Sequence, residues 1–317
     1  MRSLLALALA FAAAAHPVAA AAPYPHKSVT LVTHSSPGGG SDVFLRTLAK
    51  HLGPRMGIHL AVENVSGGSG ARAVARVAQA PADGSVLYAT TPTYIQTTLL
   101  SKPPHGYESL TLFFFNDTAT TEIYTRTESP HNTLADALAH MKTNRGKARW
   151  GASNPASLER IAMERLNRLS GVRAVVVSHE GGGDQVIGVL NGTYDLGIGE
   201  IQELRAQIEA RKLRLLAVLT EKRLPGGFSD LPTAREQGVD LVVTKFRGLA
   251  GPKKLPAGVI KAWEQGLEAV LADPAYRQEY AREHLVPAFM DHHEAARFTT
   301  RFADELAASL RELGIAR

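Results

Sequence analysis

The sequence predicts an α/β protein of two lobes with a ligand cleft between them. The chain has 317 residues, and about 295 remain after an N-terminal leader, more than one hydrophobic core usually serves. Short runs rich in β-branched residues alternate with segments of helical periodicity, which is typical of α/β units around largely parallel sheets. Glycine-rich turns join strand to helix in both halves of the chain, so each half is expected to form a lobe.

The N-terminus has the layout of a secretory signal peptide. Arg2 is followed by an apolar run over residues 4–15 and by small residues over 18–22. The apolar run is shorter than the roughly 20 residues that a transmembrane helix needs. Residues 1–22 are therefore interpreted as a signal peptide, cleaved after Ala20 or Ala22, and the mature chain is expected to be a soluble periplasmic protein.

The composition excludes several classes of protein. The chain has no cysteine, so a disulfide framework, a thiolate nucleophile and a lipid-modified N-terminal cysteine are all ruled out. The formal net charge is +5, or one less without Arg2, and a mildly basic surface helps to attract anionic solutes. Nucleic-acid binding is the competing interpretation of the pI of about 9.4. However, the basic residues are scattered among acids, and no zinc-finger or RNP-type motif occurs.

The expected elements divide the chain into two lobes and a C-terminal helix. The first lobe covers residues 23–125, with 249–289 returning to it, and the second covers 126–248. Strands are expected over 28–33, 59–63, 86–89, 150–153, 172–177, 213–220 and 240–244. Helices are expected over 133–142, 157–169, 184–190, 256–272 and 292–313. A T-x-x-D box opens the first of these helices, and residues 290–317 are expected to pack on the lobes.

One segment is not interpreted as native sequence. Residues 116–125, NDTATTEIYT, look like the in-frame translation of a common sequencing-adapter oligonucleotide. The alternative is a polar loop with an accidental N-D-T glycosylation triplet. We expect that an apolar strand leading into the second lobe has been overwritten at residues 113–125, and no function is inferred from them.

The glycine turns are the candidate ligand site. A strand that ends in glycines and leads into a helix presents unpaired N–H groups at the positive end of the helix dipole, which suits an anion. Glycine allows the ligand to approach those amides closely. The candidate turns are PGGGSD after the first strand, SGG after the second, and the GGG of residues 181–183, which faces them from the other lobe.

Each turn also has a structural explanation. A single turn is equally consistent with a tight βα connection whose glycines serve geometry alone. Asp42 is favoured in a first helical turn by the dipole itself. The hydroxyls of Thr90 and Thr91 either donate hydrogen bonds to a ligand or form hydrogen bonds within a turn.

No enzymatic or metal site is indicated. The chain lacks G-x-G-x-x-G, G-x-x-x-x-G-K-[ST] and G-x-S-x-G. His292 and His293 are adjacent and do not share a helical face as H-E-x-x-H would arrange its histidines. We therefore expect no catalytic residue, no cofactor and no metal.

Several segments together resemble the Bug-type substrate-binding proteins of tripartite tricarboxylate transporters. They are YPHKSVTLVTHSSPGGGSDVFLRTLAKHL, VENVSGGSGARAVARVAQAPADG, WGASNPASLERIAMERL, GGGDQVIGVLNGTYDL, KLRLLAVLTEKR and LPTAREQG. The resemblance implies a two-lobed periplasmic-binding-protein-like fold that holds a carboxylate-bearing ligand through backbone amides, hydroxyls and bridging waters.

The resemblance also implies a set of ligand-binding positions and some departures from the family. The matching positions are Pro37, Gly38, Gly39, Gly40, Ser41, Asp42, Ser66, Gly67, Gly68, Thr90, Thr91, Ser153, Ser157, Gly181, Gly182 and Asp184. Glu180 stands where relatives often have lysine, and Arg160 where they commonly have histidine. Gly199-Glu200 replaces a usual Asp-Asn pair, so the identity of the ligand stays open.

The expected function is that of a monomeric periplasmic receptor for a di- or tricarboxylate or a related carboxylate, including aromatic or amino-acid relatives. Such a receptor closes by hinge motion and delivers its ligand to the membrane subunits of a tripartite tricarboxylate transporter. The alternative is an exported ligand-binding partner of a sensor system. An enzyme is the third interpretation, and no nucleic-acid partner is expected.

Overall fold

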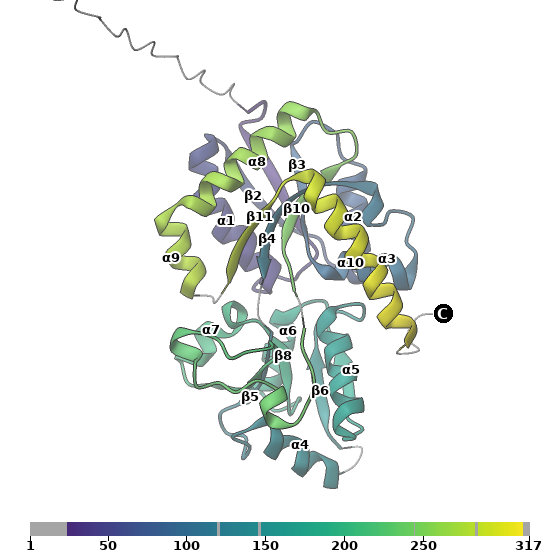
Figure 1. The fold of residues 1–317 in the computed structure, drawn as a ribbon, viewed down its shortest axis with the longest axis vertical. Helices are drawn as coiled ribbons and strands as arrows, with labels where there is room; N and C mark the ends of the chain where they lie inside the picture. Colours follow the sequence, from purple (N-terminus) through teal and green to yellow (C-terminus); the bar gives the residue numbers. More distant parts are fainter. Residues whose placement is uncertain (1–23, 119–120, 145–146, 244, 283–284, 313–317) are drawn as a thin grey trace, which may run out of the picture.

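The computed structural model of the protein describes residues 24–118, 121–144, 147–243, 245–282 and 285–312. The expected signal peptide lies outside these residues. The chain forms two α/β lobes, one above the other in Figure 1. The predicted fold class is thus confirmed. No helix in the described ranges has both the length and the apolar character that a membrane span requires.

The first lobe is built on a six-stranded sheet with the order β11-β4-β10-β3-β1-β2. Its strands are β1 (Ser28–Thr33), β2 (His59–Asn64), β3 (Val86–Thr90), β4 (Leu110–Thr118), β10 (Gly248–Pro252) and β11 (Val286–Met290). Strands β1, β2 and β3 run parallel, whereas β10 is antiparallel to β3 and β4.

Helices cover both faces of this sheet. They are α1 (Gly40–Met56), α2 (Ala71–Ala78), α3 (Pro92–Ser101), α8 (Ala257–Ala272), α9 (Pro274–Arg282) and α10 (His292–Glu312). One apolar core joins α1 and α8 around the buried Trp263, and a second joins α2, α3 and α10 around Tyr88 and Tyr94. Both cores follow from the alternation of buried side chains on the two faces of each strand.

The second lobe has smaller sheets. Strands β5 (Glu122–Arg126), β8 (Gly197–Gly199) and β9 (Leu213–Val218) pair antiparallel, and β6 (Arg149–Ala152) pairs parallel with β7 (Val175–Ser178). The helices are α4 (Leu134–Thr143), α5 (Leu158–Ser170), α6 (Gly182–Leu190) and α7 (Ile201–Glu209). Helices α4 and α5 share a core centred on the fully buried Trp150, whereas α6 and α7 pack in a neighbouring core with Tyr124 and Tyr194.

Helices α4 and α5 are capped as their sequences predict. The Thr133 hydroxyl accepts a hydrogen bond from the Asp136 N–H at 3.0 Å, as the T-x-x-D box predicts. The Ser157 hydroxyl does the same for the Arg160 N–H at 3.0 Å, and Gly171 ends α5 in the left-handed conformation.

Two sequence expectations about the strands are wrong. The sheets are mixed rather than largely parallel, because the chain returns to the first lobe and inserts β10 antiparallel between β3 and β4. Residues 240–243 form no strand. The Val243 N–H donates a hydrogen bond to the Leu219 carbonyl at 2.9 Å, but no strand is formed around this contact. Residue 244, the end of that expected strand, lies outside the described ranges.

The chain crosses between the lobes twice. The first crossing lies between β4 and β5, so β5, placed before the lobe boundary at 125 from sequence, pairs within the second lobe. The second crossing runs through Lys245, Phe246 and Arg247 into β10. The Phe246 ring packs edge-on against Phe298 and Phe302 of α10, with ring centroids 5.2 and 5.0 Å away. The C-terminal helix therefore contacts this crossing directly.

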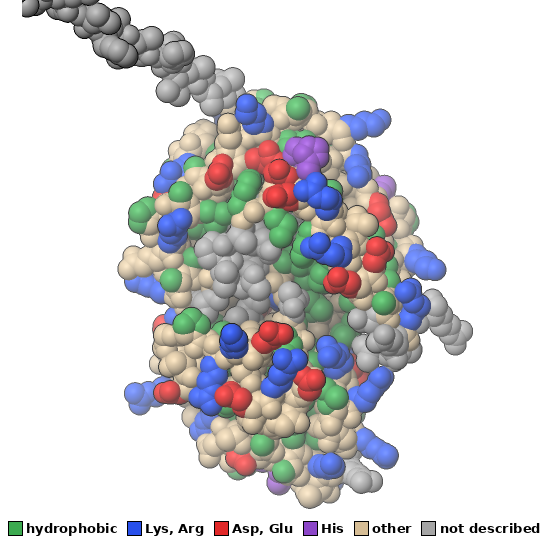
Figure 2. Space-filling model, viewed as in Figure 1, with side chains coloured by type: hydrophobic (Ala, Val, Ile, Leu, Met, Phe, Trp, Pro, Cys, Tyr) green, Lys and Arg blue, Asp and Glu red, His purple; other side chains and the backbone are tan. Residues whose placement is uncertain are grey.

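The surface carries charges of both signs. On the face drawn in Figure 2, lysine and arginine side chains are interspersed with aspartate and glutamate over both lobes. This mixture fits the scattered charges of the sequence. On this face there is no continuous basic stripe of the kind that follows a nucleic-acid backbone.

The segment 113–125 coincides with the first crossing. Residues 113–118 fall in β4, which lies between β11 and β10, and residues 122–125 fall in β5, which lies between β8 and β9. Residues 119 and 120 lie outside the described ranges. Glu122 of β5 is fully buried, and its charge contributes to raising the pKa of Lys245. The expectation that the native residues differ therefore still rests on the sequence of the segment itself.

We predict that independent reads of the source DNA replace residues 113–125 with an apolar segment of strand-like composition. The physical reason is that the first four residues of β5 are buried, and apolar side chains are favoured at buried positions. Recovery of NDTATTEIYT from unrelated libraries would contradict this prediction.

Candidate functional site

The candidate site is a cavity where the two lobes meet. Its volume is about 20 Å³, close to the space that one water molecule needs. The cavity is lined from the first lobe by His34, Ser35, Gly40, Ser41, Thr91 and Thr93, and from the second lobe and the crossing by Ser153, Glu159, Gly182, Glu200, Glu203 and Lys245. A ligand larger than water can therefore enter only when the lobes separate.

The turn after β1 is held in shape by Asp42. The Asp42 carboxylate accepts hydrogen bonds from the Gly38 N–H at 2.9 Å, from the Asn64 amide at 3.0 Å and from the Arg46 guanidinium. Burial opposes ionisation of this acid, but these hydrogen bonds prevail and lower its pKa below the usual value. Asp42 thus organises the turn, and its carboxylate is not among the cavity-lining groups.

The glycine turns of the two lobes lie against each other. A Cβ at Gly181 would lie 2.5 Å from the Ser36 hydroxyl, and one at Gly183 would lie 3.0 Å from the Pro37 carbonyl. A Cβ at Gly182 would lie 2.7 Å from the Glu203 carboxylate. These glycines have no left-handed φ, so they are needed for space rather than for backbone conformation.

Hydroxyl groups near the cavity are buried without partners. Thr91 is the N-cap of α3, yet its hydroxyl does not cap that helix, although threonine at this position usually does. Among the described residues its oxygen has no hydrogen-bond partner, and neither do the hydroxyls of Thr90 and Ser36. Buried polar groups normally bond to protein, water or a ligand, so Thr91 offers a free donor to a molecule in the cleft.

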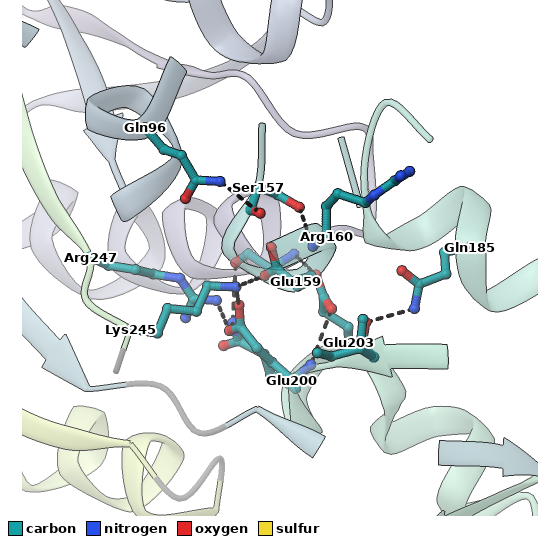
Figure 3. A network of polar contacts seen from close by, with 12 residues as sticks. Gln96, Ser157, Glu159, Arg160, Gln185, Glu200, Glu203, Lys245 and Arg247 are labelled. Atoms are coloured by element: carbon teal, nitrogen blue, oxygen red, sulfur yellow. Dashed lines mark hydrogen bonds and ion pairs between the residues drawn. The ribbon is translucent and has the colours of Figure 1, made fainter. Parts of the chain in front are cut away.

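The floor of the site is a network of buried ions (Figure 3). Lys245, on the second crossing, pairs with Glu159 of α5 and with Glu200 at the start of α7, and Arg247 pairs with Glu200. Burial opposes the charge on both Lys245 and Glu159, but their attraction prevails: the pKa of Lys245 is raised and that of Glu159 is lowered. Both groups are therefore ionised at neutral pH.

Glu203 differs from the other acids of this network. Its carboxylate accepts hydrogen bonds from the Gly40 N–H, across the cleft, and from the Glu200 N–H at 3.2 Å. Burial raises the pKa of Glu203 to about 7, with the Glu159 charge acting in the same direction and with Lys245 and the Gly40 hydrogen bond opposing it. The acid is therefore partly protonated at neutral pH.

Another titratable group of the cavity is neutral. Burial lowers the pKa of His34 to about 4, and its Nδ1 lies 2.9 Å from the Tyr88 hydroxyl. His34 consequently contributes a hydrogen-bonding group, not a charge, at neutral pH.

The structure brings some of the expected site residues together and separates others. Those that line the cavity are Gly40, Ser41, Thr91, Ser153 and Gly182; Pro37, Gly38, Gly39, Asp42, Ser66, Gly67, Gly68, Thr90, Ser157, Gly181 and Asp184 do not line it. Ser157 caps α5, and its carbonyl accepts from the Gln96 amide of the first lobe at 3.0 Å. Asp184 is exposed.

The structure also shows where the residues that depart from the family pattern lie. Glu180 is exposed and is not among the lining residues. Arg160 donates to the Val176 carbonyl at 2.9 Å and pairs with Glu164, which ties α5 to β7. Glu200 alone of these departures lies in the cavity.

Sequence reasoning missed Glu159, Glu203, Lys245, Arg247 and His34. Lys245 and Arg247 stand in the otherwise apolar run VVTKFRGLA, and two cations within a buried run were a usable signal. Glu159 and Glu203 resemble ordinary first-turn helical acids, so the sequence held no comparable signal for them.

Comparison with known proteins identifies the family. A profile described as "Tripartite tricarboxylate transporter family receptor" matches residues 44–314. The chain belongs to this family. Its members are solute-binding receptors, so the chain is a binding protein and not an enzyme. Among the described residues, no cluster of three or more potential ligands could hold a metal ion.

Individual relatives agree with this membership. A protein of Agrobacterium vitis, from the TAR-I ttuE-ttuC' intergenic region, is 27% identical over 92% of this chain and 86% of its own length. The periplasmic binding protein BugD has a TM-score of 0.87 at 22% identity, covering 92% of this chain and 99% of its own. The protein Rpa4515 of R. palustris, solved with adipate, has a TM-score of 0.87 at 24% identity over the same shares.

We predict that Glu203→Gln changes how stability depends on pH. The folded-state pKa of about 7 exceeds the ordinary 4.5, so the folded protein holds this proton more tightly than the unfolded chain. The resulting stabilisation is complete below pH 4.5 and is lost as pH rises through 7. The free energy of unfolding of the variant, relative to the wild type, should therefore rise by about 2 to 3 kcal/mol between pH 5 and pH 8.

Urea unfolding at both pH values measures this difference. The groups that face Glu203 are Lys245, Glu159, Glu200 and Tyr124, and both proteins retain them. Glu209→Gln, at an exposed position near the end of α7, is the control and should leave the pH dependence unchanged. A relative stability that stays constant would show that the pKa of Glu203 is ordinary, and one that falls with pH would show that this pKa is lowered; either result would contradict the prediction.

Proposed function

We propose that this chain is an exported periplasmic receptor that captures a small carboxylate between its lobes and delivers it to the membrane subunits of a tripartite tricarboxylate transporter. The single observation that carries the proposal is the site at the lobe interface. There, the first amide of α1 and the unpartnered hydroxyl of Thr91 face a cavity that both lobes close.

The chemistry of this site supports an anionic group on the ligand. The N–H groups that begin α1 lie at the positive end of a long helix, where carboxylates are favoured. In the closed cleft the Gly40 N–H already holds a carboxylate, that of Glu203. The same amide is therefore able to receive the carboxylate of a ligand.

The arrangement of the lobes supports capture by closure. The cavity is small and buried, and two chain segments join the lobes, so entry requires rotation about these crossings. Adipate in Rpa4515, which shares the fold, is a dicarboxylate. Its presence there supports the choice of a dicarboxylate or a related carboxylate for this chain.

We expect at least one small carboxylate to raise the melting temperature of the purified mature protein. The panel contains dicarboxylates, tricarboxylates, amino acids and neutral sugars. At about 100 times its Kd, a ligand adds roughly 2.7 kcal/mol to stability, which corresponds to a shift of a few degrees in a protein of this size. Neutral sugars should give no shift, because helix N-termini favour anions.

Two glycine variants connect this readout to the site. Gly182→Val should abolish the shift, since its side chain would meet Glu203, and Gly39→Val should do the same, since its side chain would overlap the Ser35 hydroxyl. Gly227→Val is the control, because a Cβ there meets nothing within 4 Å. Normal binding by both folded site variants, or a sugar that binds where no carboxylate does, would refute the proposal.

We predict a mature N-terminus at Ala21 or Pro23. The small residues before these positions suit signal peptidase, and removal of the leader is required for a soluble periplasmic protein. Intact-mass measurement of protein from the periplasmic fraction decides the matter. If the protein is instead found in the cytoplasm with its leader intact, it is not exported, and that part of the proposed function is wrong.

A further inference from the structure

A second pocket, the α4 pocket, lies in the second lobe. Its volume is about 340 Å³, within the range of about 300 to 1,000 Å³ that is usual for ligand pockets. Its walls are the end of β5, the loop that follows, the last turns of α4 and the chain just before β8. In Figure 1, α4 lies at the end of this lobe that is far from the first lobe. The α4 pocket shares no lining residue with the cleft cavity, so it is a separate site.

The lining of the α4 pocket is rich in basic groups. Its basic side chains are Arg126, His131, His140 and Lys147. Among the lining residues that the structure describes, Asp195 contributes the one carboxylate, and this accepts a hydrogen bond from the Arg149 N–H at 2.8 Å. Two permanent cations thus face one acid, and the pocket is positive even when both histidines are neutral. All of these residues lie outside the segment 113–125.

Arg126 is a cation without an acceptor. Its side chain is half-buried, yet within the described ranges its guanidinium forms neither an ion pair nor a side-chain hydrogen bond. The guanidinium lies against the backbone of Gly192, where a Cβ would be 3.2 Å from Nη1. Arginine has five N–H donors in a rigid fork that matches an oxyanion. A half-buried guanidinium with no acceptor therefore indicates an acceptor that comes from outside the chain.

The two histidines add neutral donors beside this cation. Nε2 of His140 lies 3.1 Å from the amide nitrogen of Asn144; because an amide nitrogen only donates, Nε2 accepts and the proton of the neutral ring is on Nδ1. The His131 ring lies next to it, with ring centroids 4.9 Å apart. Burial and the neighbouring His140 lower the pKa of His131, so this ring is also neutral and carries one N–H. Arg214 holds the loop in place by donating to the His131 carbonyl at 2.9 Å.

We propose that the α4 pocket binds a phosphate group, held by the charges of Arg126 and Lys147 and by the N–H groups of the two histidines. The donors reach the pocket from four segments of the chain, and the oxygens of a tetrahedral phosphate accept from several directions, whereas a carboxylate accepts in one plane. Inorganic phosphate, a soluble phosphate ester and a lipid headgroup share this chemistry. The inference is independent of the proposed function.

Titration calorimetry with inorganic phosphate on the purified mature protein tests the site, in a buffer free of other oxyanions. The wild type should bind with a Kd of about 1 mM or lower. Arg126→Gln should weaken binding by about tenfold or more, because the charge and the forked donors are lost. Arg149→Gln is the matched control: this arginine of the same lobe is exposed and does not line the pocket, so the wild-type Kd should be kept.

Lys147→Gln keeps the test decisive if Arg126→Gln does not fold. Lys147 is exposed and forms no ion pair within the described ranges, so its substitution should not disturb folding, yet it should weaken phosphate binding by about threefold or more. Absence of binding up to about 10 mM phosphate, or wild-type affinity in both folded variants, would overturn the proposal.

The cleft is also suited to anions, and Gly182→Val separates the two sites. A valine there would meet Glu203 in the cleft and should leave the binding of phosphate unchanged. Phosphate binding that is lost in folded Gly182→Val but kept in Arg126→Gln would place the anion in the cleft and overturn the proposal. Arg126→Gln should in turn keep the thermal shift produced by a carboxylate, so failure of the phosphate site leaves the proposed function standing.

Vesicles distinguish the sources of the phosphate group. The protein is sedimented with phosphatidylcholine vesicles that do or do not contain phosphatidic acid. Cosedimentation that needs phosphatidic acid and is reversed by inorganic phosphate would support the site and assign it to a lipid headgroup. Binding of inorganic phosphate without cosedimentation would support it as a site for a soluble phosphate.

Discussion

The closed arrangement of the lobes depends on the pairing of Glu200 with Lys245 and Arg247. Both cations lie on the second crossing, and Glu200 is the N-cap of α7 in the second lobe. Each charge is almost fully buried, and a buried charge is tolerable only when it is paired and hydrogen-bonded. The pairing therefore sets the path of the crossing, and this path sets the distance between α1 and α7 across the cleft.

Glycine serves two distinct purposes around this cleft. Gly38 and Gly67 have φ angles of +81° and +117°, which side chains rarely adopt. Gly40 and Gly182 have ordinary backbone angles, but a Cβ at either would meet charged side chains of the network. The sequence shows the same residue type in both situations, so it indicates that the turns matter without indicating which glycines face the partner lobe.

The fold was largely predictable because its units are local. The strand over residues 28–33 has the predicted limits, and helices α4, α5 and α8 begin and end within two residues of expectation. The crossings were harder. The first falls in the uninterpreted segment, and β10 is the short run GLAGP, whose glycines and proline disfavour a strand assignment.

The candidate site was less predictable than the fold because contacts distant in sequence assemble it. Glu159 and Lys245 are 86 positions apart, and Gly40 and Glu203 are 163 apart. The pattern Glu200-x-x-Glu203 forms a capping box at the start of α7, and this local role accounts fully for both acids in the sequence. Only the folded chain places the second acid of the box against the opposite lobe.

The packing of Phe246 has a consequence for the outer surface of the molecule. This ring lies between Lys245 and Arg247 in sequence and packs against two rings of α10. The C-terminal helix is therefore joined, outside the cleft, to the segment about which the lobes would rotate.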